Sequence, residues 1–88
     1  MPWLNLGAVL HSTGDKQGAH VAFEKALSQP GDGEAEVHSN LGSLYSDEER
    51  YDLSIQHYEA AVTLKPDLLE ALSGLISSRR MGTRMNII

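Results

Sequence analysis

Apolar residues recur along this chain at steps of three and four, which is the spacing of one face of an α-helix. Trp3, Leu6 and Leu10 follow these steps, and apolar residues between 37 and 45 repeat them. No segment shows the strict alternation of apolar and polar residues that is typical of a strand. The pattern predicts five helices, at residues 3–13, 16–28, 34–46, 50–64 and 67–80.

An internal repeat relates the two halves of the chain. Asn5-Leu6-Gly7 returns as Asn40-Leu41-Gly42 after 35 residues, and Phe23 is matched by Tyr58 at the same spacing. A third copy begins at Pro66. In each full copy, a glycine in the first helix would let the second helix approach closely, because glycine has no side chain in the way. The large aromatic residue would then fill the layer between neighbouring copies.

Each copy also carries the same residue types at fixed places. The first copy reads Trp3-x2-Leu6-Gly7-x2-Leu10, then Ala19-x3-Phe23 and Pro30. The second reads His38-x2-Leu41-Gly42-x2-Tyr45, then Ser54-x3-Tyr58 and Pro66. This arrangement resembles the tetratricopeptide repeat (TPR), whose pattern is Trp-x2-Leu-Gly-x2-Tyr, then Ala-x3-Phe and a proline. The departures are His38 for the aromatic residue, Leu10 for the tyrosine and Glu49 for the usual turn glycine.

The resemblance implies an all-α fold, a right-handed superhelical solenoid of five helices paired antiparallel. On this alignment, repeat 1 covers about 1–33, repeat 2 about 34–66 and a partial repeat 67–80, so that the array occupies 1–80. Residues 81–88 form a basic and apolar tail. The third repeat lacks its second helix, which is compatible with a piece of a longer protein.

The charge of the chain argues against nucleic acid as a partner. The formal net charge is −5, and all 12 acidic residues lie within 1–78. An acidic body repels phosphate backbones. No apolar run approaches the roughly 18 residues that a membrane span requires. The first residues lack the charged start and apolar stretch of a signal peptide, so we expect a cytoplasmic protein with no membrane contact.

Nothing in the sequence predicts catalysis, a cofactor or a bound metal. The chain has no cysteine, which excludes thiolate metal sites and cysteine nucleophiles. Its four histidines include no pair at the i, i+4 spacing of a helical zinc site. His38 falls on a core-facing position, where we expect a packed, hydrogen-bonded histidine. The Gly-x-Ser-x-Gly elbow of a serine nucleophile is also missing. We therefore expect a protein that is not an enzyme, with no catalytic residue and no metal ligand.

The TPR resemblance does predict a binding surface. In such arrays the first helices of successive repeats line a concave inner groove. The residues carried over to that groove are Asn5, Ala8, His11, Ser12, Glu36, Ser39, Asn40, Ser43, Asp47, Glu70, Ser73 and Ser77. Long TPR superhelices hold extended peptides with a ladder of asparagines placed before Leu-Gly. Asn5 and Asn40 occupy that place, and Gly74 interrupts the ladder. Loop bonding by these asparagines and solvated filler serines are the alternatives.

We therefore predict a scaffold module that binds an extended or helical segment of a partner polypeptide. Three acidic residues of the groove, Glu36, Asp47 and Glu70, favour a partner with basic residues. One alternative is a structural spacer or self-association unit of a longer TPR protein. We also hypothesise a homodimer through the last helix, whose uncovered apolar residues would be Leu68, Leu72, Leu75 and Ile76. A further alternative is the regulatory arm of an enzyme whose catalytic domain is absent.

Overall fold

The computed structural model describes residues 3–29 and 33–86, and every regular element within these ranges is an α-helix. The five helices are α1 (Trp3–Ser12), α2 (Lys16–Ser28), α3 (Glu34–Asp47), α4 (Tyr51–Leu64) and α5 (Leu69–Asn86). The predicted all-α array of helix pairs is therefore confirmed. The predicted proline of the first repeat, Pro30, lies outside the described residues.

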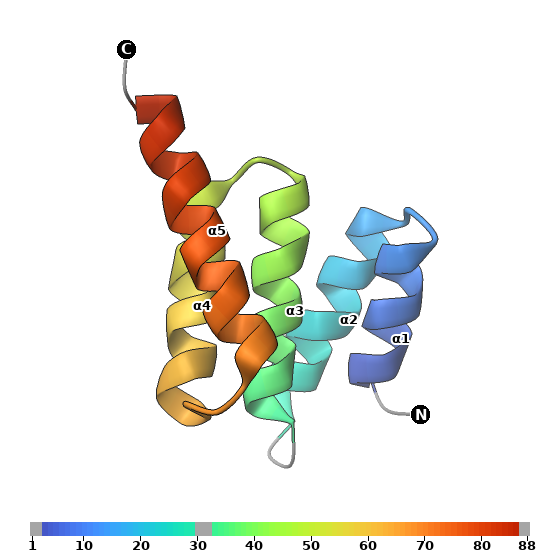
Figure 1. The fold of residues 1–88 in the computed structure, drawn as a ribbon. Helices are drawn as coiled ribbons and strands as arrows, with labels where there is room; N and C mark the ends of the chain where they lie inside the picture. The colour runs from blue at the N-terminus through green and yellow to red at the C-terminus, as the bar shows by residue number, and fades with distance from the viewer. Residues whose placement is uncertain (1–2, 30–32, 87–88) are drawn as a thin grey trace.

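The helices follow one another as an elongated array (Figure 1). α1 packs against α2 and α3 against α4, which are the two predicted pairs. Across the junctions, α3 contacts both helices of the first pair, and α5 contacts both helices of the second. The principal dimensions of the array are 44 × 28 × 18 Å. The first helices α1, α3 and α5 thus contact one another in sequence along the array.

The turn inside each pair depends on one residue in the left-handed region. Gly14 has φ of 93° after α1, and Asp15 then caps α2 by accepting a hydrogen bond from the backbone N–H of Gly18 at 2.9 Å. Glu49, which replaces the usual turn glycine in the second repeat, adopts φ of 59°. A side chain in this region costs about 1–2 kcal/mol. The turn geometry is thus kept in the second repeat at the expense of local strain.

α5 differs from the sequence prediction at both ends. It begins at Leu69 instead of residue 67, and it continues to Asn86 through most of the expected tail. Gly82, which weakens a helix by its own propensity, lies beside the start of α4. A Cβ at Gly82 would be in ordinary contact with Tyr51 Cβ, at 3.4 Å. Packing on α4 therefore favours helix at residues that local propensity alone assigned to a tail.

A fitted aromatic ring holds each helix pair together. A Cβ at Gly7 would lie 2.5 Å from Phe23 Cε1, and a Cβ at Gly42 would lie 2.8 Å from Tyr58 Cδ2. Both distances are far below van der Waals contact, so only glycine fits at these two positions. Phe23 is fully buried and Tyr58 is 6% exposed. The predicted close approach at both glycines is confirmed.

A buried hydroxyl pair ties α3, α4 and α5 together beside Tyr58. The Oγ of Ser54 donates to the carbonyl oxygen of Gly42 at 2.7 Å. Ser78 of α5 lies 2.7 Å from the same Ser54 Oγ and can donate to it. Both serines are at most 1% exposed, and a buried hydroxyl without a partner costs about 1–3 kcal/mol. Ser54 is therefore small enough to let α4 approach Gly42, and it also contributes a hydrogen bond to α3.

We predict that Gly42→Ala lowers the free energy of unfolding by about 1–3 kcal/mol, because the new methyl group overpacks the Tyr58 ring. Gly82→Ala is the matched control, since its new Cβ meets ordinary contacts and alanine favours the helix. It should leave the protein at least as stable as the wild type. Urea unfolding followed by circular dichroism measures both. Equal stability of the two variants would show that Tyr58 does not pack against Gly42.

Candidate functional site

The predicted binding residues differ in how accessible the fold leaves them. Those on the surface are Asn5, Ala8, Ser12, Asp47, Glu70, Ser73 and Ser77. Partly buried are His11, Glu36, Asn40 and Ser43. Ser39 is only 4% exposed and so offers almost nothing to a partner. We call the remaining eleven residues, on α1, α3 and α5, the inner face.

Asn5 and Asn40 hold matching places on neighbouring helices. Each lies two residues before the glycine that receives an aromatic ring, Gly7 in α1 and Gly42 in α3. Asn5 is exposed and Asn40 is half-buried. A carboxamide both donates and accepts hydrogen bonds, so such a pair is suited to the N–H and C=O groups of an extended peptide.

One acidic residue of the inner face is already bonded within its own repeat. Lys65, at the end of α4, donates from Nζ to Oε2 of Glu36 at 3.1 Å. This hydrogen bond lowers the pKa of Glu36 below its usual range. A basic residue of a partner would therefore have to compete with Lys65 for this carboxylate.

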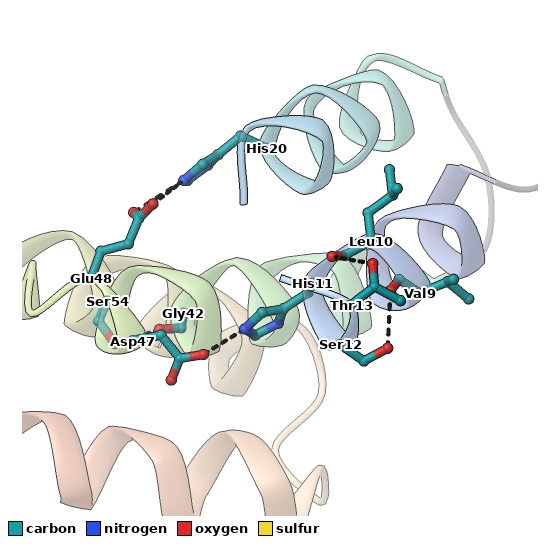
Figure 2. Close-up of polar contacts among 10 residues, drawn as sticks. All are labelled: Val9, Leu10, His11, Ser12, Thr13, His20, Gly42, Asp47, Glu48 and Ser54. Atoms are coloured by element: carbon teal, nitrogen blue, oxygen red, sulfur yellow. Dashed lines mark hydrogen bonds and ion pairs between the residues drawn. The ribbon is translucent and has the colours of Figure 1, made fainter. Parts of the chain in front are cut away.

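A second acidic residue of the inner face is bonded across the junction of the two repeats. The Nε2 of His11 in α1 donates to Oδ2 of Asp47, the last residue of α3, at 2.6 Å (Figure 2). No ion pair of Glu70 is present in the part of the chain that the structure describes. Of the three acids expected to attract a basic partner, two thus have partners inside the protein.

The neighbouring residue Glu48 makes a matching bond to α2. Nε2 of His20 donates to Oε1 of Glu48 at 3.1 Å, as Figure 2 shows beside the His11 pair. Together the two histidines tie both helices of the first repeat to the end of α3. Sequence reasoning missed these pairs, since partners 28 and 36 residues apart carry no local spacing signal.

The other two histidines form a stack on the second-helix side of α3. The Nδ1 atoms of His38 and His57 are 3.0 Å apart, so the hydrogen bond predicted for His38 is made to α4. Tyr45 stacks on His57, and its ring also lies 4.9 Å from that of His20. Two imidazoles joined by one hydrogen bond need one proton between the two facing nitrogens. The hydrogen bond therefore leaves one of the two facing nitrogens without a proton.

A metal site and a membrane-spanning helix are both absent from the described residues. Within them, no three side chains of His, Cys, Asp or Glu converge as a metal site would require. None of the described helices combines the length and the apolar character needed to cross a membrane.

The comparisons with known families agree with the repeat. Two family models match the chain, one at residues 2–30 and one at residues 35–68, and both describe the tetratricopeptide repeat. Together the matches span well over half of the 88 residues. The chain therefore belongs to the tetratricopeptide-repeat family, whose members generally mediate protein–protein interaction and are typically non-catalytic. No curated protein matches the chain.

From the position of His57 in the histidine stack, we predict that the free energy of unfolding falls in acid. Burial lowers the pKa of His57 from its ordinary 6.5, and the neighbouring His38 and His20 lower it further. Below about pH 6.5 the unfolded chain therefore binds a proton that the folded chain resists. The stability contributed by neutral His57 is complete above this pH and is lost as the pH falls toward the folded pKa.

His57→Gln should remove this contribution to the pH dependence. We expect the free energy of unfolding to fall less between about pH 7.5 and pH 5 in the variant than in the wild type. Urea unfolding at a series of pH values measures the difference. Parallel curves for the two proteins would mean that His57 is not held neutral by the fold.

Proposed function

We propose that this chain binds an extended segment of a partner polypeptide across its inner face. The observation that carries the proposal is the matched pair Asn5 and Asn40, which are accessible on neighbouring first helices. The inner-face residues beside them are mostly small, with Ala8, Ser12 and Ser73 all exposed. A low surface of this kind lets the main chain of a ligand approach the two carboxamides. From the sequence we also propose that the module is not an enzyme and that it acts in the cytoplasm.

The charges of the inner face favour a basic partner only modestly. Glu36 and Asp47 already have internal partners, which leaves Glu70, an exposed residue at the start of α5, as the strongest attraction. An exposed charge pair contributes at most about 1 kcal/mol. We therefore expect affinities in the micromolar range, with main-chain hydrogen bonds contributing more than charge.

A second proposal, self-association through α5, rests on Ile76. Ile76 follows Gly42 by 34 residues and so stands where the first two repeats have their ring-receiving glycine. An isoleucine there leaves no room for a ring placed as Tyr58 is placed on Gly42, so a further helix would have to pack on α5 in a different way. Yet Ile76 is 59% exposed and Leu69 is 73% exposed. The expectation that Leu68 and Leu75 are uncovered is wrong, because both pack against the cluster around Tyr58.

We propose that a second copy covers this side of α5 in a two-fold, antiparallel pairing. Glu70 lies near the start of α5 and Arg80 further along it, and both are exposed. An antiparallel pair would bring Glu70 of one copy toward Arg80 of the other. The neighbouring Arg79 is already bonded to Glu59 at 2.7 Å. A closed two-fold pair is also the commonest arrangement of soluble oligomers.

A peptide selected on the wild-type chain from a random-sequence phage library provides the probe for the inner face. We predict that Asn40→Ala weakens binding of this peptide about tenfold, because two hydrogen bonds to its main chain are lost. Gln56→Ala, which removes an exposed carboxamide from α4, is the control and should leave the affinity unchanged. Isothermal titration measures both. Equal affinities for Asn40→Ala and the wild type would place the ligand elsewhere on the chain. The selection of no peptide would contradict the proposal that the chain binds extended peptides.

The dimer makes a separate prediction. Sedimentation velocity should show a mass rising with concentration from 9.6 kDa toward twice that value. Ile76→Lys should stay monomeric, because a charge would be buried between the two copies. Val9→Lys is the matched control, since Val9 is 57% exposed on α1 and should not affect association. Association of Ile76→Lys that equals that of the control would reject this surface.

A further inference from the structure

The side chain of Tyr58 crosses from the second-helix side of the array toward the inner face. The near part of the ring lies against α3, where a Cβ at Gly42 would be 2.9 Å from Cγ. The far part lies against α5, where a Cβ at Gly74 would meet Cζ, Cε1 and the hydroxyl oxygen. The phenol therefore lies between two glycines on neighbouring first helices, with its hydroxyl at the α5 side.

The surroundings of the hydroxyl are residues of the inner face. Burial raises the pKa of Tyr58, and the negative charges of Asp47 and Glu70 raise it further. The neighbouring hydroxyl of Ser43 lowers the pKa of Tyr58. These three residues are inner-face residues on α3 and α5. A phenol O–H can donate to one acceptor even when a neighbouring hydroxyl donates to its oxygen.

The repeat alignment shows that this hydroxyl lies where the third repeat lacks an asparagine. Gly74 follows Asn40 by 34 residues, so it holds the place on α5 that Asn5 and Asn40 hold on α1 and α3. A glycine there contributes no polar side chain. However, the Tyr58 hydroxyl oxygen lies 2.6 Å from the point where a Cβ at residue 74 would be. The hydroxyl thus occupies the start of the space that an asparagine side chain would take.

We propose that Tyr58 supplies the third polar contact of the inner face, after Asn5 and Asn40, by donating a hydrogen bond to a main-chain carbonyl of the bound peptide. This inference rests on the proposed function. Since Tyr58 is 6% exposed, only a group that comes very close can reach its hydroxyl. The missing side chain at Gly74 is what lets the Tyr58 phenol reach this position on α5. The apparent gap in the asparagine ladder is then a substitution of one donor for another, delivered from α4.

Repeat 1 supplies the natural control for removing the hydroxyl. Phe23 precedes Tyr58 by 35 residues and fits against Gly7 as Tyr58 fits against Gly42. Tyr58→Phe should therefore keep the packing of the ring and lose only the oxygen. Tyr45→Phe removes a tyrosine oxygen on the opposite side of α3, where the ring stacks on His57. This second variant controls for a general effect of losing a hydroxyl.

The test uses the library-selected peptide as the probe. Tyr58→Phe should weaken its binding about three- to tenfold, the effect of one hydrogen bond, and Tyr45→Phe should leave it within about twofold. Unchanged affinity in Tyr58→Phe, with Asn40→Ala still weakened, would overturn this inference and leave the proposed function standing. Unchanged affinity in Tyr58→Phe and in Asn40→Ala would overturn both, and so would the selection of no peptide.

A second measurement on the unmodified chain does not depend on the folding of any variant. With tyrosine labelled by ¹³C at Cζ, the resonance of Tyr58 should shift when the peptide is added, because its O–H gains an acceptor. The resonances of Tyr45 and Tyr51 should stay in place. A stationary Tyr58 resonance at saturating peptide would overturn the inference even if Tyr58→Phe proved unstable.

Discussion

The structure depends on one contact made in each repeat, an aromatic ring of the second helix against a glycine of the first. Phe23 fits Gly7 and Tyr58 fits Gly42 at distances that exclude any side chain on the glycine. Each ring also reaches the next first helix, since Phe23 clusters with Leu41 of α3 and Tyr58 with Ala71 of α5. The same ring therefore joins the two helices of a repeat and joins that repeat to the next. It also fixes how α1, α3 and α5 lie beside one another, and so positions the inner face.

Polar contacts at the junction of the repeats change what the inner face can offer a partner. His11 and His20 bond to Asp47 and Glu48 at the end of α3, and Lys65 bonds to Glu36. Pairs that are this accessible contribute little to stability individually. Their larger effect is to occupy carboxylates that would otherwise attract a basic ligand. In the proposed binding mode, recognition by this surface would therefore rely on carboxamide and hydroxyl groups that fit a peptide main chain.

Features with a local period could be predicted from the sequence, and features made by distant residues could not. Helical spacing and the repeat of 35 residues were enough to predict the five helices and the contacts at Gly7 and Gly42. The end of α5 was mispredicted because packing on α4, invisible to propensity, extends the helix past Gly82. Among the candidate binding residues, repeat position identified the helices but not the burial of Ser39. The ion pairs were missed because each joins residues at least 20 positions apart.

In the proposed binding mode the ligand lies along the first helices, and the exposed outer sides of the second helices do not contact it. Amide chemical-shift mapping by NMR tests this binding mode most directly, with the library-selected peptide added to the ¹⁵N-labelled chain. The account predicts the largest shifts on α1, α3 and α5, at Asn5, Asn40 and Ser77. Shifts confined to exposed residues of α2 and α4, such as Val21 and Gln56, would contradict it.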